Sequence, residues 1–448
     1  MRITFLISFL ILSHFSFGQT PIIKATSSKV DIKNDGHLSK GSWTLMPDLK
    51  PDIYQTNVNG KSKKVIFYTD IDSISFIVKP KKTYDFIILL NEKDTCWTQI
   101  NTIPKFEFSK QYIKKNKGEF SFEVPEVQEL VHIIVALTPT GIKDKNMVNH
   151  DTKYYEKILK EFGQYKDEPI VNKIDSLLKK QYYAVLKMDA CGFYFNGDSI
   201  KKDSTYNNLS WGNTNFIESY TSQIEQFAKK TSFRKFYKKQ STYYNRLISL
   251  MNNQTPIHKQ WDWLENQFSL RYDNYRITFS PLVNGWHSTN RFIQEDFKQT
   301  VMFICGPIEN NEYSTKINEG LMTRIVFTEI DHNYVNPISD KYNKEINIAF
   351  DDLSKWATKK ALNNYRNAYD VFNEYMTWSV FSIYAFENFN PEDFKMINDK
   401  VELQISDWRG FKNFKAFNQK MIELYNNKME NEKIEDLYPV ILEWCKKQ

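Results

Sequence analysis

The sequence predicts an α+β protein, in which a β-rich N-terminal region is followed by a mainly helical domain with a small sheet. Short segments rich in β-branched and aromatic residues, separated by turn-forming pairs, continue to about residue 140. From Asp151 onward, apolar residues recur at helical spacing. Aromatic residues make up 15% of the 448 residues, whereas glycine and proline number only 14 each, which favours a packed core over linker-like segments.

The composition excludes several classes of protein. With 41% hydrophobic and 25% charged residues, the chain is expected to fold into two or three domains rather than to remain disordered. The formal net charge of +6, spread over the whole length, does not indicate a nucleic-acid partner. No later window is apolar enough to span a bilayer, so we expect no stable membrane insertion once a signal peptide is removed.

Residues 1–18 have the pattern of a signal peptide. Arg2 supplies a positive charge, Ile3–Leu12 form a short apolar run, and Ser16 and Gly18 are small residues at the positions that a signal peptidase reads. We therefore expect a mature chain beginning at Gln19 and export to the periplasm or the extracellular space. A buried N-terminal helix or a retained anchor is the alternative interpretation.

Residues 19–140 form the predicted β-rich region, either a small sandwich or a β-layer beside a larger domain. Turn-forming pairs such as Asn59-Gly60 separate its segments. The nearly continuous apolar run near residue 131 is typical of a strand covered on both faces. We expect strands at Lys64–Tyr68, Ser73–Val78, Tyr84–Leu90 and Val131–Leu137.

Residues 141–448 form the predicted helical domain. Tyr154, Ile158 and Phe162, for example, fall on one face of a helix. Two short strands are expected within this domain, at Tyr275–Leu282 and Val301–Cys305. Further helices are expected at Val171–Leu186, Asn215–Phe227, Phe233–Met251, Glu319–Tyr334 and Leu353–Phe386.

The four cysteines give no metal or redox motif, because they are too far apart for C-x-x-C spacing. An oxidising compartment permits one or two disulfides, and buried free thiols are the alternative. The residues concerned are Cys96, Cys191, Cys305 and Cys445.

One segment carries recognisable chemistry. Thr328, Glu329 and His332 form a T-E-x-x-H sequence, with Thr328 and His332 one turn apart on a helix. This is the spacing of H-E-x-x-H, in which two histidines hold Zn²⁺ and the glutamate activates a metal-bound water. A threonine hydroxyl is a poor zinc ligand because it remains protonated and uncharged at neutral pH.

Three interpretations of this motif are open. The site has lost its metal, or Glu329 and His332 at i and i+3 bind an ion with a different set of ligands, or the residues form a polar cluster on the helix that only hydrogen-bonds its surroundings. Glu374 adds weight to a ligand site, because it lies in a strongly aromatic segment where a carboxylate is costly to bury without a partner or a cation.

Four segments together resemble a family of secreted bacterial proteins of unknown function, which is similar to zinc peptidases of the gluzincin type. They are Tyr84–Ile100, Phe122–Leu137, Thr278–Leu282 and Thr328–Pro337, the last reading TEIDHNYVNP. The resemblance implies a zincin-like domain in which Glu329 is the general base and His332 and Glu374 are zinc ligands. It also implies an extended peptide or protein substrate, for which Tyr275–Leu282 is the candidate edge strand. Thr328 departs from the family pattern at a ligand position.

Three further residues are candidates for accessory roles. His287 lies in a turn, where it is either solvated or able to reach the cleft. Asp331 adjoins His332 and is a candidate to cap a helix, to pair with Arg324 or to support the site. Tyr334 is a candidate donor to a tetrahedral intermediate, although aromatic helix residues more often belong to the core.

The sequence therefore predicts an exported zinc-dependent peptidase or a degenerate relative of one. A non-catalytic protein that binds peptides or partners on an inactive peptidase-like fold is the alternative, and a structural envelope protein with an aromatic surface is a third possibility. The chain has no G-x-S-x-G, P-loop or G-x-G-x-x-G motif, which argues against serine hydrolases of the nucleophile-elbow type and against nucleotide enzymes.

Overall fold

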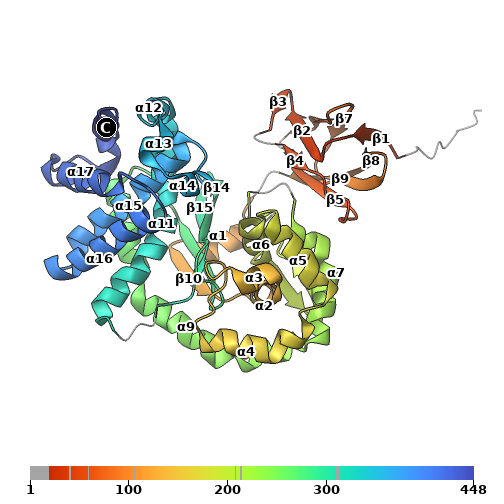
Figure 1. The fold of residues 1–448 in the computed structure, drawn as a ribbon, viewed down its shortest axis with the longest axis horizontal. Helices are drawn as coiled ribbons and strands as arrows, with labels where there is room; N and C mark the ends of the chain where they lie inside the picture. The colour runs from red at the N-terminus through yellow and green to blue at the C-terminus, as the bar shows by residue number, and fades with distance from the viewer. Residues whose placement is uncertain are drawn as a thin grey trace, which may run out of the picture. The chain divides into compact units, whose positions relative to one another are not determined.

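The computed structural model of the chain describes residues 20–39, 42–58, 60–104, 107–206, 208–211, 214–308 and 312–448 (Figure 1). The chain forms two compact units that divide after residue 106. The first is β-rich and the second is mainly helical with a small sheet. The predicted signal peptide, residues 1–18, lies outside the described residues.

The first unit is a small β-sandwich. One sheet has the strand order β1-β8-β9-β5, and the other has the order β3-β2-β6-β7 with β4 also pairing with β2. Side chains from both sheets, including Val30, Phe67 and Phe86, form one hydrophobic core. The strands are β1 Ile22–Ala25, β2 Lys29–Asn34, β3 His37–Leu38, β4 Trp43–Thr44, β5 Asp52–Val58, β6 Lys63–Tyr68, β7 Ser73–Val78, β8 Thr83–Leu90 and β9 Asp94–Pro104. The strands predicted over residues 64–90 are thereby confirmed.

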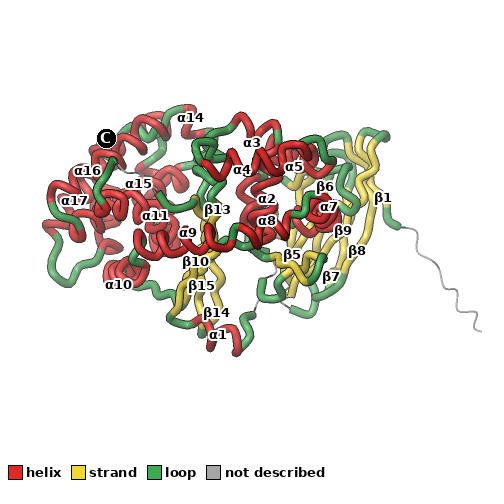
Figure 2. Tube along the Cα trace, turned by 90° about the horizontal axis from the view of Figure 1, so that it is seen from below, coloured by secondary structure: helices red, strands yellow, loops and turns green. Residues whose placement is uncertain are grey.

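The second unit is built around one four-stranded sheet with the order β10-β13-β15-β14 (Figure 2). Strands β10 (Glu119–Glu123), β13 (Asn274–Ser280) and β15 (Phe297–Cys305) are parallel, and β14 (Ser288–Gln294) runs antiparallel to β15. A separate hairpin is formed by β11 (Phe193–Asn196) and β12 (Ser199–Lys202).

Helices surround this sheet. They are α1 Lys110–Asn116, α2 Glu126–Leu137, α3 Pro139–Lys143, α4 Lys153–Phe162, α5 Pro169–Lys179, α6 Tyr183–Ala190, α7 Phe216–Lys230, α8 Phe233–Lys239, α9 Ser241–Gln254, α10 Ile257–Gln267, α11 Thr315–Lys341, α12 Asn343–Ala349, α13 Leu353–Trp356, α14 Lys359–Leu362, α15 Ala368–Asn388, α16 Pro391–Leu403, α17 Phe414–Asn427 and α18 Tyr438–Cys445. A π-helical turn spans Gln404–Trp408. Helix α11 packs against β14, β15 and α15, while α2 contacts β13.

The prediction that Tyr275–Leu282 is an edge strand is wrong. Strand β13 is an inner strand with β10 and β15 on its two sides, and the sheet edges are β10 and β14. This strand order was not predicted, because neither β10 nor β14 was recognised as a strand in the sequence. The antiparallel edge strand is β14, and it begins beside α11.

The strand predicted at Val131–Leu137 is also wrong, because these residues belong to α2. Every residue of Val127–Leu137 is buried, so the segment lacks the polar face that marks an amphipathic helix. Glu126 and Glu129 in the first turn favour the helix through its dipole. Since α2 contacts β13, residues 107–140 are part of the second unit, and the division lies earlier than the predicted boundary near 140.

Three long predicted helices are each divided. Gln181, at φ +65°, separates α5 from α6 within the predicted Val171–Leu186 helix. The segment Phe233–Met251 contains α8 and α9, and Leu353–Phe386 contains α13, α14 and α15. The helix predicted at Glu319–Tyr334 lies within the longer α11.

All four cysteines are buried free thiols, as one of the two alternatives held. Within the described ranges, none of the helices combines the length and the apolar character needed to cross a bilayer.

Candidate functional site

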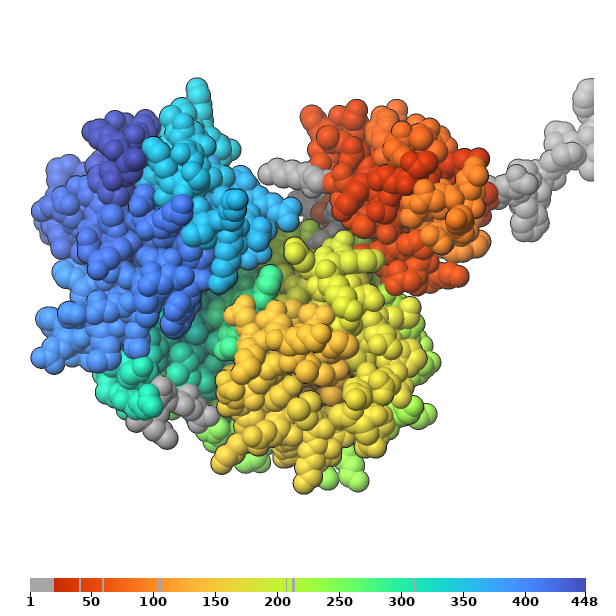
Figure 3. All heavy atoms as spheres, viewed as in Figure 1, coloured from red at the N-terminus to blue at the C-terminus, as the bar shows by residue number. Residues whose placement is uncertain are grey.

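The second unit contains a cavity of about 1250 Å³. It is large enough for several amino-acid residues, since drug-sized ligands occupy pockets of roughly 300–1,000 Å³. Its walls come from segments 146–152, 281–289 and 305–308, from α11 and α15, and from residues 360–365 and 404–409. In the space-filling view, the surface is hollowed between the blue C-terminal helices and the yellow segment that contains α3 and α4 (Figure 3).

One wall is a loop that is fixed to a neighbouring segment. The amide of Gly285 donates to the carbonyl of Asn146 at 2.7 Å, and the amide of Asn149 donates to the carbonyl of Leu282 at 2.8 Å. A Cβ at position 285 would lie 2.4 Å from Asn146 Oδ1 and 3.2 Å from the Asn146 carbonyl oxygen, so a larger residue here would require Asn146 to move. Trp286 follows at φ +60°, an uncommon backbone conformation for a bulky residue. The loop thereby holds Trp286 and His287 at the cavity.

Helix α11 carries three cavity residues at successive turns. The helix begins after Ser314, whose hydroxyl accepts a hydrogen bond from the amide of Ile317 at 3.1 Å. Arg324, Thr328 and His332 follow at i, i+4 and i+8 and all line the cavity. Glu329 lines it as well.

Helix α15 packs against α11 and contributes Glu374 to the same cavity. The four residues that the sequence singled out, Thr328, Glu329, His332 and Glu374, therefore lie around one space. The Nε2 atom of His332 lies 3.7 Å from Oε1 of Glu374. His332 Nδ1 faces Asn336 Oδ1 at 3.3 Å.

Glu374 is held by a cation that the sequence did not reveal. Its Oε2 atom accepts from the Arg409 guanidinium at 2.8 Å and lies 3.3 Å from Nε1 of Trp378. Arg409 also contacts the hydroxyl of Tyr365. The Glu374 carboxylate raises the pKa of Arg409 despite its burial. The negative charge of Glu374 is therefore balanced by the guanidinium of Arg409.

In this arrangement the side chains of Thr328 and Glu374 are not available to bind a zinc ion. The Thr328 hydroxyl donates to the carbonyls of Arg324 at 2.9 Å and of Ile325 at 3.2 Å, so it is committed to its own helix. Glu374 is committed to Arg409. Within the described part of the chain, no three His, Cys, Asp or Glu side chains are grouped so that they could hold a metal ion.

Glu329 is buried among charged groups of both signs. Burial raises the pKa of its carboxyl, and Glu374 adds to this effect, whereas Lys187 and Arg409 oppose it. Lys187, on α6, is fully buried, and its Nζ atom has no hydrogen-bond partner among the described residues. It lies 4.8 Å from the centre of the Phe303 ring, and burial lowers its pKa.

The three accessory candidates have different positions. His287 lines the cavity, with its Nε2 atom buried and unpartnered among the described residues. The hydroxyl of Tyr334 pairs with that of Tyr275 at 2.6 Å, and Asp331 is fully buried, so neither lines the cavity. Neither carboxylate oxygen of Asp331 has a hydrogen-bond partner among the described residues, and burial raises its pKa well above the usual range. The suggested Asp331–Arg324 pair is absent from these residues.

Arg324 differs from the other cavity arginine, Arg409. Its Nε atom is buried without a hydrogen-bond partner among the described residues. Burial lowers its pKa to about 10, and only the thiol of Cys305 acts against that shift. A guanidinium without a carboxylate is thus held at the wall of the cavity.

Three tryptophans that line the cavity are also exposed to solvent. Trp408 is 64% exposed, Trp211 54% and Trp286 37%. Aromatic side chains of this kind give large contact areas at little entropic cost when a ligand binds. They make the cavity a candidate binding surface.

The sequence reasoning missed Lys187, Arg324 as a wall residue, and Arg409. A lysine in the otherwise apolar aromatic run near Tyr183 was the available signal for Lys187. Arg324 is four residues before Thr328, so helical spacing alone places it on the same face. Nothing in the local sequence links Arg409 to Glu374.

No protein-family model, curated protein or solved structure matches the chain.

Proposed function

We propose that this protein is exported and binds extended peptide segments in the cavity of its second unit, without a metal ion and without hydrolysis. The observation that carries the proposal is the 2.8 Å pair between Glu374 and Arg409. It places a fixed guanidinium on the carboxylate that a zinc peptidase would need as a ligand. The expectation of export rests on residues 1–18.

The proposed peptidase-like, or zincin-like, architecture is supported by the order of elements. Strand β15 leads into α11, which carries Thr328, Glu329 and His332, and α15 places Glu374 opposite them. The antiparallel edge strand β14 begins at the cavity, where Ser288 and Thr289 line it. These are the parts that the family resemblance implies, arranged around one space.

A peptide is favoured as the ligand because β14 offers backbone groups at the cavity. The strand pairs with β15 on one side, and no described strand pairs with its other side. An extended segment added there would gain main-chain hydrogen bonds, while the cavity would receive its side chains. The exposed rings of Trp211, Trp286 and Trp408 would cover such a segment.

The test is a binding titration of the full chain with pentaalanine carrying an N-terminal fluorophore. We expect binding to the wild type and weakening of at least about fivefold in Trp408→Ala, because an exposed aromatic at the wall contributes contact area. Trp97→Ala is the matched control, since Trp97 is 46% exposed in the first unit and should leave affinity unchanged. Absence of binding, or equal loss in both variants, would overturn the proposal.

Hydrolysis is the competing function, with Glu329 as base and His332 and Glu374 as ligands. The 3.7 Å separation of His332 and Glu374 favours it, since both atoms are within reach of one ion. Elemental analysis after zinc loading decides between the two. We expect far less than one zinc per chain and no cleavage of the labelled peptide. Zinc bound at one ion per chain, together with peptide cleavage that is lost in Glu329→Gln, would show that the protein is an enzyme and would overturn the proposal of binding without hydrolysis.

A further inference from the structure

We infer that the cavity selects peptides by their C-terminal carboxylate, which binds the guanidinium of Arg324. This inference rests on the proposed peptide binding and adds the class of ligand and the residue that recognises it. The carboxylate would be the partner that Arg324 lacks among the described residues.

Arg324 has a polar atom that is shielded from water and has no partner. The side chain is partly buried, and its buried Nε donor loses water without gaining an acceptor among the described residues, which is unfavourable unless a ligand provides one. The wall around Arg324 offers only the Cys305 thiol as a titratable neighbour that raises its pKa. A carboxylate fits the planar fork of a guanidinium and forms two parallel charge-assisted hydrogen bonds with it.

The charges inside the cavity are unequally balanced. Glu374 is paired with Arg409, and burial favours the neutral forms of both Glu329 and Lys187, so Arg324 is the cavity cation without an acidic partner among the described residues. His287 responds to the remaining positive charge, since burial together with Lys187, Arg324 and Arg409 lowers its pKa to about 3. A ligand anion therefore enters a space where positive charge is not fully balanced.

The length of the cavity wall along α11 suits a short peptide. Arg324 and His332 lie eight residues apart on α11, a separation of about 12 Å along the helix axis. At about 3.3 Å per residue, an extended peptide covers this distance with three to four residues. A chain whose terminal carboxylate lies on Arg324 would pass Thr328 and Glu329 and reach His332. The cavity volume of about 1250 Å³ accommodates a segment of this size.

The experiment compares three probes on the full chain by the same titration. They are labelled pentaalanine with a free C-terminus, the same peptide as its amide, and an amide in which the third residue is aspartate. We expect the free acid to bind at least about tenfold more tightly than the alanine amide, as charge-assisted hydrogen bonds allow. The aspartyl amide should resemble the alanine amide, because its carboxylate is not at the end of the chain.

Two variants assign the effect to Arg324. Arg324→Gln should bind acid and amide within about twofold of each other, whereas Arg324→Lys should keep part of the preference because it keeps the charge. Arg366→Gln, which removes the same charge from an exposed residue that does not line the cavity, should keep all of it. Near-ultraviolet circular dichroism checks that each variant is folded.

The outcomes separate this inference from the function beneath it. Tight binding of all probes without preference overturns the carboxylate site and leaves peptide binding intact. A preference that survives in Arg324→Gln also overturns it. Tight binding of the aspartyl amide would show that side-chain carboxylates are taken, which overturns selection of the terminus. If no probe binds the wild type, both the inference and the proposed function fail.

Discussion

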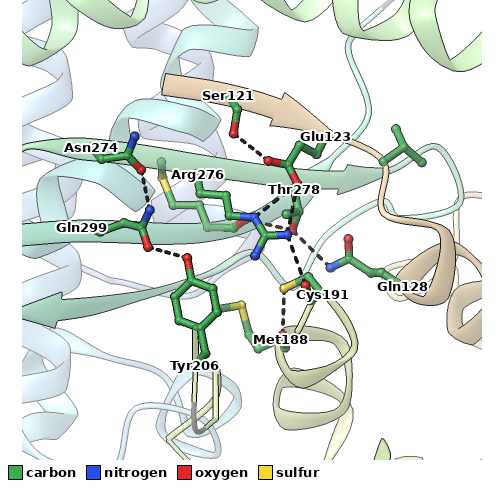
Figure 4. A network of polar contacts seen from close by, with 12 residues as sticks. Ser121, Glu123, Gln128, Met188, Cys191, Tyr206, Asn274, Arg276, Thr278 and Gln299 are labelled. Carbon is green, nitrogen blue, oxygen red and sulfur yellow. Dashed lines mark hydrogen bonds and ion pairs between the residues drawn. The ribbon is translucent and has the colours of Figure 1, made fainter. Parts of the chain in front are cut away.

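Two partly buried arginines of the second unit, Arg276 and Arg324, have opposite surroundings. Arg276, on β13, lies in a closed network (Figure 4). Its Nε and Nη2 atoms donate to Glu123 Oε2 at 3.2 and 3.1 Å, and Nη2 also donates to the carbonyl of Cys191 at 3.2 Å. Arg324 lines the cavity without a carboxylate.

The network around Arg276 continues through neighbouring strands. The hydroxyl of Tyr206 donates to Gln299 at 2.5 Å, and Gln299 in turn donates to Asn274 at 2.5 Å. Because Glu123 is close, the pKa of Arg276 is raised, whereas that of Arg324 is lowered to about 10. The guanidinium of Arg276 links β13 to β10 through Glu123, whereas that of Arg324 has no carboxylate partner among the described residues. This difference can be tested by measuring stability.

The largest change in stability is expected on substitution of Arg276. Arg276→Gln removes the guanidinium and leaves Glu123 without its partner. We expect a loss of about 2–3 kcal/mol in the free energy of unfolding, less than for a fully buried pair because the Glu123 side chain is 37% exposed. Urea denaturation measures it. Arg234→Gln, at an exposed pair with Glu126, is the control and should cost under about 1 kcal/mol. Equal losses in the two variants would remove the distinction.

At the cavity, we expect a substitution of arginine to increase the free energy of unfolding instead of decreasing it. Arg324→Met keeps much of the side-chain volume and removes a partly buried charge that has no carboxylate partner among the described residues. We expect the chain without ligand to gain about 1–2 kcal/mol in the free energy of unfolding, since replacing poorly compensated buried charge by apolar groups is often stabilising. The same denaturation series measures this change. A loss comparable to that of Arg276→Gln would mean that Arg324 is structural and not reserved for a ligand.

The sequence correctly predicted several of the helices and strands that are buried on one face and exposed on the other. Strands β6, β7 and β8 follow an alternating or β-branched pattern, and α7 has a polar face, so their periodicity is readable. Prediction failed for α2, which is buried all round and therefore has no periodicity. It also failed where one residue interrupts a helix, as Gln181 does at φ +65°.

The candidate site shows the same limit. Thr328, Glu329 and His332 were found because they share a helix, and their spacing alone fixes their common face. Glu374 stood out as an acid in an aromatic helix. Arg409 and Lys187 were missed because they reach Glu374 and Glu329 only through tertiary packing, which no local pattern encodes.

A metal-binding variant tests how firmly Arg409 excludes a cation from Glu374. Thr328→His supplies the missing ligand but leaves Glu374 paired at 2.8 Å. Adding Arg409→Met frees that carboxylate, so we expect the double variant to bind zinc at least about tenfold more tightly than Thr328→His, or about 1.4 kcal/mol. Competition with a chromogenic chelator measures the affinities. Equal zinc affinity in the two variants would show that Arg409 does not compete with a metal.

A pH-dependent effect is expected at two neutral histidines, His287 at the cavity and His132 in α2. Burial lowers the pKa of each to about 3, so between about pH 3 and 6.5 the unfolded chain binds protons that the folded chain does not. Stability therefore falls as the pH drops through this window, and each histidine contributes about 1.4 kcal/mol per pH unit.

Substitution separates the two histidines. His132→Asn and His287→Asn should each reduce the slope of the free energy of unfolding between pH 4 and 6, measured by urea denaturation. Only the His287 slope should respond to saturating pentaalanine free acid, because a carboxylate on Arg324 offsets the positive charge that helps to keep His287 neutral. His132 stacks on Phe303 and has Lys187 as its charged neighbour, so the peptide should leave its slope unchanged. A peptide effect on both slopes, or on neither, would contradict the distinction between Arg276, which is paired within the sheet, and Arg324, which we propose to bind the carboxylate of a ligand.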